Sequence, residues 1–244
     1  MSTPLEHDYL KRILTAPVYD VAKRTPLHKA DRLSDKLGVE LWLKREDMQS
    51  IFSFKIRGAY TRMKQLNPQQ LRQGVIAVSA GNHAQGVALA ARRLNTPALI
   101  VMPCTTPRIK VDNVRRLGAK VILHGDQYDQ AQNYAQQLAE ERQLTLIHPF
   151  DDPWVIAGQG TIGLEIMQDC ATPPHAIYVP VGGGGLSAGI ACYCKQIHPQ
   201  TQIIGVEPED AASLKAAIEA GRRVQIDQTG LFADGVAVKK VGQH

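Results

Sequence analysis

The sequence lacks long apolar runs and has few cysteines, and each shortage excludes a class of protein. No stretch approaches the ~18 consecutive apolar residues that predict a membrane-spanning helix. The four cysteines are too few and too irregularly spaced for a disulfide framework in a chain of 244 residues. The N-terminal residues are charged and amphipathic, without the apolar core of a secretory signal. We therefore expect a soluble cytoplasmic protein that does not enter a membrane.

Concentrated charge of one sign is also missing. The formal net charge is +5, but lysine and arginine are interspersed with acidic residues and form only pairs such as Arg115-Arg116 and Lys239-Lys240. We interpret these pairs as solvated surface, which argues against a nucleic-acid partner. Cys192 and Cys194 form a C-x-C pattern with no second ligand pair, so no metal site is expected.

What the sequence does contain is a regular alternation of short apolar runs and longer amphipathic stretches. The runs are rich in valine and isoleucine, as buried parallel strands should be, at residues 41–43, 75–78, 98–102, 120–123, 145–147, 176–181 and 202–206. Helical patterns lie between them, at residues 55–66, 83–94, 107–117, 127–142, 155–170, 186–197 and 210–220. This alternation predicts an α/β fold with parallel sheet, and the turn cluster at residues 149–153 suggests a crossover between two domains.

The segment Ser53-Phe54-Lys55-Ile56-Arg57 places a lysine among apolar neighbours at the start of a predicted helix. Such surroundings disfavour the ammonium form and lower the pKa of the lysine. A neutral amine is what a Schiff base requires. On this segment alone, the ordinary alternative is a helix-start lysine that extends to solvent.

A second polar cluster follows the strand predicted at residues 75–78. Ser79, Gly81, Asn82 and His83 lie where that strand turns into a helix. Free backbone N–H groups and the partial positive charge of a helix N-terminus suit a carboxylate or a phosphate at such a turn. An ordinary turn in which Asn82 caps the helix is equally compatible with the pattern.

Four consecutive glycines, Gly182, Gly183, Gly184 and Gly185, stand between a predicted strand and a predicted helix that begins at Leu186. Such a run costs backbone entropy, and it is useful where N–H groups must surround an anion closely. We therefore predict a phosphate site here. A dinucleotide site is a weaker alternative, because Gly183, Gly185 and Ala188 fit the looser fingerprint, with Glu207 as the acidic residue.

These motifs, in this order and at this spacing, resemble those of the fold type II family of pyridoxal-phosphate enzymes, and within it the threonine dehydratases (threonine ammonia-lyases). The resemblance runs from about Tyr9 to the end and includes KRED at residues 44–47, SFKIRGAY at 53–60, SAGNHAQGVA at 79–88, IAGQGT at 156–161 and VGGGGL at 181–186. Each motif is moderately specific, and together they are highly specific. The stretch at residues 9–27 is similar to the biosynthetic, isoleucine-pathway form. Ser50-Ile51 departs from the family's frequent Pro-Val.

The resemblance implies a role for each matching residue. Lys55 forms the Schiff base with pyridoxal 5'-phosphate and removes the α-proton of the substrate, and Phe54 packs near the cofactor. Asn82 bonds the ring hydroxyl of the cofactor, and the loop with Ser79, Gly81 and His83 holds the substrate carboxylate. The phosphate ligands are the backbone N–H groups of Gly182, Gly183, Gly184, Gly185 and Leu186. The implied reaction converts L-threonine to 2-oxobutanoate and ammonia, and L-serine is a second candidate substrate.

The resemblance also implies an architecture of two parallel-sheet α/β domains, like that of the tryptophan synthase β-subunit. Residues 1–47 begin the large domain, residues 48–147 form the small domain, and residues 148–244 continue the large domain. We expect the large domain to be incomplete and a regulatory domain to be absent, and we expect a homo-oligomer, a tetramer by family. Two alternatives stay open: a non-catalytic truncated product, and a serine dehydratase or another β-elimination enzyme of the same fold.

Overall fold

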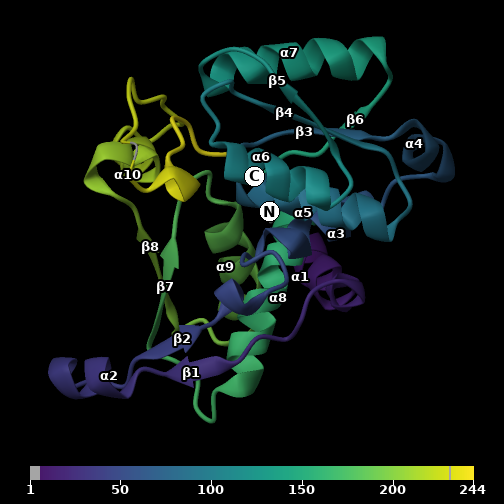
Figure 1. The fold of residues 1–244 in the computed structure, drawn as a ribbon. Coiled ribbons are helices and arrows are strands. Elements are labelled where there is room, and N and C mark those ends of the chain that lie inside the picture. The colour runs from purple at the N-terminus through teal and green to yellow at the C-terminus, as the bar shows by residue number, and fades with distance from the viewer. Residues whose placement is uncertain (1–5, 231) are drawn as a thin grey trace.

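The computed structural model describes residues 6–230 and 232–244, which form three small sheets and a set of helices packed against them (Figure 1). A four-stranded parallel sheet has the order β5-β4-β3-β6, from β3 (Val75–Val78), β4 (Ala98–Met102), β5 (Lys120–Leu123) and β6 (Thr145–Leu146). β7 (Ala176–Pro180) pairs in parallel with β8 (Gln202–Val206), and β1 (Leu27–Lys29) pairs antiparallel with β2 (Trp42–Lys44). The predicted α/β class with parallel sheet is confirmed.

The helices are longer than the strands and connect them. They are α1 (Glu6–Leu14), α2 (Asp31–Leu37), α3 (Lys55–Met63), α4 (Pro68–Gln73), α5 (Asn82–Arg93), α6 (Arg108–Arg116), α7 (Tyr128–Glu141), α8 (Pro153–Asp169), α9 (Gly185–Ile197) and α10 (Ser213–Glu219). Short 3-10 turns lie at Val18–Asp20, Glu46–Met48, Glu209–Ala211 and Asp234–Val236. Within residues 6–230 and 232–244, no helix has the length and apolar character needed to cross a bilayer.

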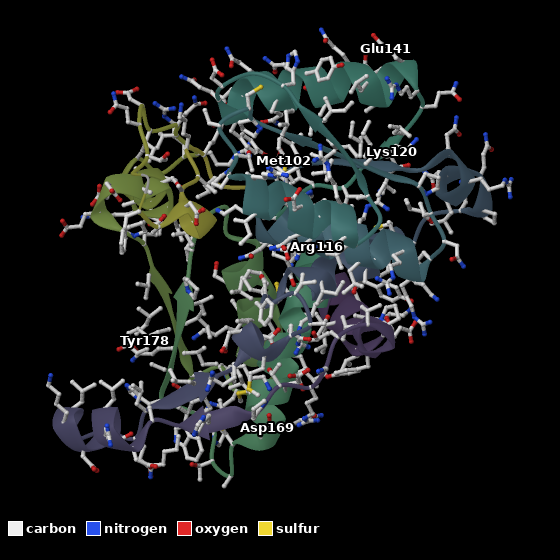
Figure 2. All side chains as sticks on the ribbon, in the orientation of Figure 1. Met102, Arg116, Lys120, Glu141, Asp169 and Tyr178 are labelled. Carbon is white, nitrogen blue, oxygen red and sulfur yellow. The ribbon has the colours of Figure 1, made fainter. Side chains whose placement is uncertain are left out.

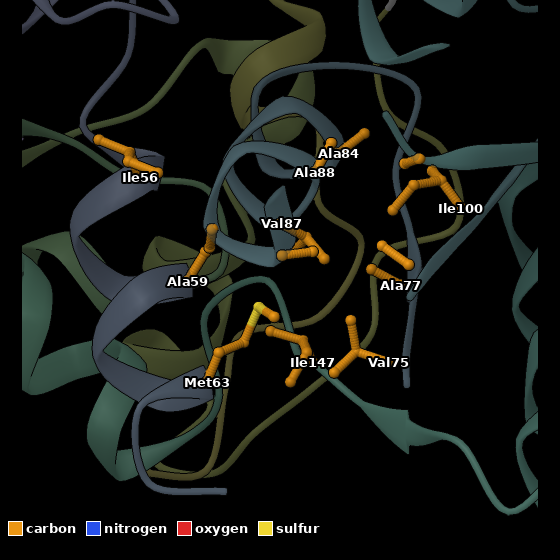
Figure 3. Packing of buried hydrophobic residues seen from close by; sticks show 14 of the residues in the cluster. Ile56, Ala59, Met63, Val75, Ala77, Ala84, Val87, Ala88, Ile100 and Ile147 are labelled. Atoms are coloured by element: carbon orange, nitrogen blue, oxygen red, sulfur yellow. The ribbon is translucent and has the colours of Figure 1, made fainter. Parts of the chain in front are cut away.

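The four-stranded sheet is covered on both faces, which explains why its central strands are apolar throughout. Every residue of β3 and β4 is buried. On one face, Ala131, Ala135 and Leu138 of α7 pack against alternate strand residues. On the other face, α3, α5 and α6 form a larger core, part of which surrounds Val87 and Ala77 in Figure 3. The sheet therefore holds the first turns of α3 and α5 in fixed positions.

A second core joins α8 and α9 to β7, and the pattern of β7 shows which face it uses. Ile177 and Val179 are buried against the helices, whereas Tyr178 between them is 65% exposed. Figure 2 shows Tyr178 on the open side of the β7–β8 sheet, away from α9. This alternation fits a sheet that is covered on one side only.

Three details of the predicted elements are wrong. Residues 41–43 were expected to form a buried parallel strand, but β2 is antiparallel and Trp42 and Leu43 are more than 40% exposed. A short apolar run does not reveal its pairing partner, and here the partner is β1, connected to β2 through α2. The helix expected over residues 55–66 ends at Met63, and the helix expected from residue 210 begins at Ser213.

The helix α4 was not predicted from the sequence, although its start carries a clear signal. Asn67 accepts a hydrogen bond from the backbone N–H of Gln70, and the Gln70 side chain accepts one from the backbone N–H of Asn67. Pro68 occupies the first helical position, where its fixed φ is favourable. The four-stranded sheet lies within the proposed small domain, but Val18 and Ala22 belong to the same core, so the domain division stays a prediction.

Candidate active site

Lys55 is the first residue of α3, and its side chain is directed to a nearby turn rather than to open solvent. Its Nζ donates a hydrogen bond to the carbonyl oxygen of Pro149 at 2.8 Å and lies 5.4 Å from the centre of the Phe54 ring. Burial of the amine lowers the pKa of Lys55 to about 8. A substantial fraction of the amine is therefore neutral near physiological pH, as a nucleophile or a base requires.

The start of α3 is held by close packing against α5. A Cβ added to Gly86 would lie 3.0 Å from the carbonyl oxygen of Lys55, so the two helices approach each other at the backbone of Lys55. The backbone N–H of Lys55 also donates to the Ser53 hydroxyl at 3.3 Å. Because Gly86 has no side chain, α5 packs directly against the backbone of Lys55, and this contact fixes the position of Lys55.

The loop between β3 and α5 presents a helix N-terminus next to this region. Ser79 Oγ accepts a hydrogen bond from the backbone N–H of Gly81 at 3.1 Å. Gly81, and not Asn82, is the N-cap, so the alternative in which Asn82 caps the helix is wrong, and Asn82 is instead an exposed first residue of α5. Its amide is therefore accessible to a ligand, and the first backbone N–H groups of α5 have no partner within the helix.

His83 follows in the same loop, but its imidazole is engaged elsewhere. The ring is 3% exposed, and Nε2 lies 2.8 Å from the carbonyl oxygen of Ile147. Burial, reinforced by the charge of Lys55, lowers the pKa of His83 to about 3. The ring is therefore neutral, and Nε2 is the donor because a carbonyl oxygen can only accept. In this arrangement only the backbone of His83 is available to a substrate carboxylate.

The glycine loop, residues 182–185, connects β7 to α9, and glycine is required at several of its positions for different structural reasons. Gly184 is the N-cap of α9 with φ +94°, a conformation that favours glycine. A Cβ on Gly183 would lie 2.3 Å from carbon atoms of the Phe150 ring, and a Cβ on Gly185 would lie 2.6 Å from the Phe150 carbonyl oxygen. The loop therefore accommodates Phe150 as well as presenting the N–H groups of the first turn of α9, including that of Leu186.

Lys55 and the glycine loop are connected through the turn at residues 148–152. Pro149 accepts from Lys55, and Phe150 packs on Gly183 and Gly185. From the sequence this turn was predicted only as a domain crossover, and the contribution of His148 and Phe150 was not predicted. The available signal was the pair of aromatic residues that flank Pro149.

Glu207 is not available as the acidic residue of a dinucleotide site. Both carboxylate oxygens of Glu207 accept hydrogen bonds from the backbone, from Leu214 at 2.8 Å and from Lys215 at 2.9 Å. Glu207 thus caps α10 instead of offering an acceptor to a ribose. Among the described residues, no group of three His, Cys, Asp or Glu side chains could hold a metal ion.

The site has the chemistry that pyridoxal phosphate requires. A half-buried lysine with a lowered pKa suits the aldehyde, and a helix N-terminus that follows a left-handed glycine suits the phosphate. The position where a Cβ would stand on Gly184 is open space, so the backbone there can be approached closely. These residues fit the cofactor that the sequence motifs imply.

Comparison with known proteins agrees with this chemistry. The family described as pyridoxal-phosphate dependent enzyme matches residues 18–243. Threonine dehydratase 1 from Solanum lycopersicum, described as biosynthetic and chloroplastic, is 60% identical over 98% of this chain and 39% of its own length. The L-threonine dehydratase of Burkholderia multivorans, described as biosynthetic, is 53% identical over 98% of this chain and 48% of its own length.

Solved structures give the same result for the fold. The processed form of threonine deaminase isoform 2 from Solanum lycopersicum is 54% identical, with a TM-score of 0.96 over 100% of this chain and 67% of that chain. Maize serine racemase is 33% identical, with a TM-score of 0.91 over 96% of this chain and 70% of that chain. The chain spans less than half the length of the two curated relatives. The resemblance predicted from the motifs, and with it the fold type II architecture, is confirmed.

Proposed function

Because this chain belongs to the pyridoxal-phosphate dependent enzyme family, we propose that it carries the catalytic lysine of a lyase that converts L-threonine to 2-oxobutanoate and ammonia. The observation that carries the proposal is the Lys55 amine, which lies half-buried at the start of α3 and donates to the carbonyl oxygen of Pro149. The names of the most similar relatives support threonine as the substrate.

In this proposal the bound cofactor supplies the electron sink for the bond changes at the substrate. Lys55 would hold the cofactor through its amine, and the same amine is placed to take the proton from the α-carbon of the substrate. Its pKa of about 8 leaves the amine partly neutral at physiological pH, so it can accept that proton. The carbonyl oxygen of Pro149 holds the free amine in place.

The other predicted residues bind and orient. The N–H groups of Gly182 to Leu186 bind the phosphate, and the first turn of α5 orients the substrate carboxylate. Asn82 has an accessible amide that can bond a ring hydroxyl, and the Phe54 ring lies beside the Lys55 amine. The active-site roles of these residues stay predictions.

The first test compares the wild-type chain with Lys55→Ala and with the control Lys64→Ala, at the other end of the same helix. With pyridoxal phosphate, we expect a visible absorption band of lysine-bound cofactor in the wild type and in Lys64→Ala, and no such band in Lys55→Ala. Ammonia release from threonine, serine and O-acetylserine is then measured side by side. Turnover of serine alone would refute the threonine assignment, and a band that survives Lys55→Ala would refute the role of Lys55.

We further propose a role in isoleucine biosynthesis, which the word "biosynthetic" in the names of both relatives supports. A cytoplasmic location and a homo-oligomeric assembly complete the proposal. Sedimentation velocity of the purified chain, with and without the cofactor, measures the assembly.

A further inference from the structure

The turn at residues 148–152 lies between β6 and α8 and contacts both Lys55 and the glycine loop. The carbonyl oxygen of Pro149 accepts from Lys55 Nζ at 2.8 Å. The ring of Phe150 lies directly against Gly183, and its backbone lies against Gly185. The turn is therefore the physical connection between the lysine that carries the cofactor and the loop that binds its phosphate.

The shape of this turn depends on one side chain, His148. Its Nδ1 accepts hydrogen bonds from the backbone N–H of Asp151 at 2.8 Å and of Phe150 at 3.3 Å. Its ring meets the Phe150 ring edge-on, with centroids 4.7 Å apart. Because Nδ1 accepts two hydrogen bonds, it carries no proton, and the proton of the neutral ring is on Nε2. Burial lowers the pKa of His148 and so favours this neutral form.

The next residues fasten the far end of the turn. Asp152 Oδ1 accepts from the backbone of Trp154 and Val155 at the start of α8, and Asp152 Oδ2 accepts from Arg62 of α3 at 2.7 Å. The turn is thus fixed at Asp152 by side-chain bonds to two helices. In its first half, the carbonyl oxygen of Pro149 accepts from Lys55, and the backbone N–H groups of Phe150 and Asp151 donate to His148. Loss of the His148 acceptor frees the peptide of Pro149 and the ring of Phe150 to move.

We propose that His148 is a positioning residue of the active site. It closes the turn so that Pro149 holds the Lys55 amine while Phe150 sets the position of the glycine loop. The inference rests on the proposed function, because it assumes that the cofactor reaches from Lys55 to the glycine loop. If the role of His148 were purely structural, its replacement would lower the melting temperature but change neither the affinity for the cofactor nor the absorption band of the lysine-bound cofactor.

The test uses the full 244-residue chain with His148→Asn and His148→Leu. Asparagine presents a side-chain oxygen that accepts from backbone N–H groups two and three residues later, as in an Asx turn, whereas leucine presents no acceptor. His175→Leu is the control, because His175 is an exposed histidine outside the turn. The readouts are the dissociation constant for pyridoxal phosphate, the wavelength of the lysine-bound absorption band, and the melting temperature.

We expect His148→Leu to weaken cofactor binding at least tenfold and to shift the band, and His148→Asn to stay within about threefold of wild type. A His148→Leu chain with a lower melting temperature but wild-type affinity and band would overturn the proposal. If His148→Leu does not fold, Phe150→Leu takes its place, because it keeps both His148 bonds and removes the ring from Gly183. It should weaken binding severalfold, and unchanged binding would contradict the inference.

These readouts separate this inference from the proposed function. A wild-type chain that shows the lysine-bound band but does not convert threonine refutes the substrate assignment and leaves the role of His148 measurable. A wild-type chain without the band refutes both.

Discussion

At the start of α3, one amine and two imidazoles share a poorly hydrated region. Burial is the main cause that lowers the pKa values of Lys55, His83 and His148, and the charge of Lys55 contributes at both imidazoles. Because a second positive charge here is unfavourable, Lys55 is the group that changes its charge near neutral pH. With a pKa of about 3, His83 stays neutral throughout the physiological range.

This arrangement predicts the pH dependence of cofactor attachment. A shift of the Lys55 pKa from 10.5 to about 8 raises the neutral fraction of the amine at pH 7 by roughly 300-fold. The rate of attachment of pyridoxal phosphate should therefore rise with pH to a midpoint near 8, measured by stopped-flow absorbance between pH 6 and 10.5. Free Nα-acetyllysine serves as the control for titration of the aldehyde itself. A midpoint equal to that of acetyllysine would show that Lys55 is not desolvated.

The sign of the effect on stability follows from the same shift. The folded-state pKa of Lys55 is below the unfolded value, so between about pH 8 and 10.5 the unfolded chain binds the proton that the folded chain has lost. The contribution of Lys55 to the free energy of unfolding therefore becomes more favourable as pH rises through this window.

At the scale of elements, the sequence predicts much of the framework, and its errors have physical reasons. The strands of the four-stranded sheet were predictable because both of its faces are covered, so β3 and β4 are continuous apolar runs. The pairing of β2 with β1 was not, because register and direction depend on a partner that is distant in sequence. For the site, the helix starts at Lys55 and next to Gly184 were predictable from local patterns.

The connection made by His148 and Phe150 was not predictable in the same way. Phe150 meets Gly183 only when the β6–α8 turn and the β7–α9 loop come together in the fold. The local sequence around Gly183 therefore does not predict that Phe150 requires a glycine there.

The crossing of α3 and α8 depends on a glycine contact of the same kind. A Cβ on Gly158 would lie 2.6 Å from the carbonyl oxygen of Arg57 and 2.7 Å from Cα of Gly58. Both are backbone atoms, so the two helices must separate to admit a methyl group. We therefore expect Gly158→Ala to lower the free energy of unfolding by about 1–3 kcal/mol, although alanine favours an isolated helix by about 1 kcal/mol over glycine.

Urea denaturation of Gly158→Ala measures this effect. Gly235→Ala is the matched control, because a Cβ there meets nothing within 4 Å and φ is not positive. The control should stay within about 0.5 kcal/mol of wild type. A Gly158→Ala chain as stable as its control would mean that the crossing is not tightly packed.

At the scale of the whole molecule, a buried ion network joins parts that are far apart in sequence. Arg57 of α3 bonds Glu165 of α8 at 2.6 Å and Glu46, from the segment after β2, at 2.8 Å. Lys44 of β2 approaches the same Glu165 at 2.7 Å. The side chains of Arg57 and Glu165 are fully buried, so solvent does not screen their charges. The network connects Lys44 and Glu46 to the helices α3 and α8.

Removing the charge of Arg57 should therefore destabilise more than a local contact. Arg57→Met leaves the carboxylates of Glu46 and Glu165 without their main partner, and we expect a loss of about 3–5 kcal/mol in the free energy of unfolding. Arg24→Met, which removes the partly exposed Arg24–Asp169 pair, is the control and should cost at most about 1 kcal/mol.

The fluorescence of Trp42 tests whether the network also makes β2 unfold together with the helices. It is recorded in chains that carry Trp154→Phe, so that Trp42 is the remaining tryptophan. Trp42 is on β2, two residues before Lys44, whereas circular dichroism at 222 nm follows the helices of both cores. With Arg57 present, the two signals should change at the same urea concentration, because Arg57 of α3 bonds both Glu46, which follows β2, and Glu165 of α8. In Arg57→Met the Trp42 signal should change first, since the remaining Lys44–Glu165 pair no longer connects to α3. If both signals of the variant change at the same urea concentration, and its free energy of unfolding falls by less than about 1 kcal/mol, the ion network does not hold residues 42–46 in place.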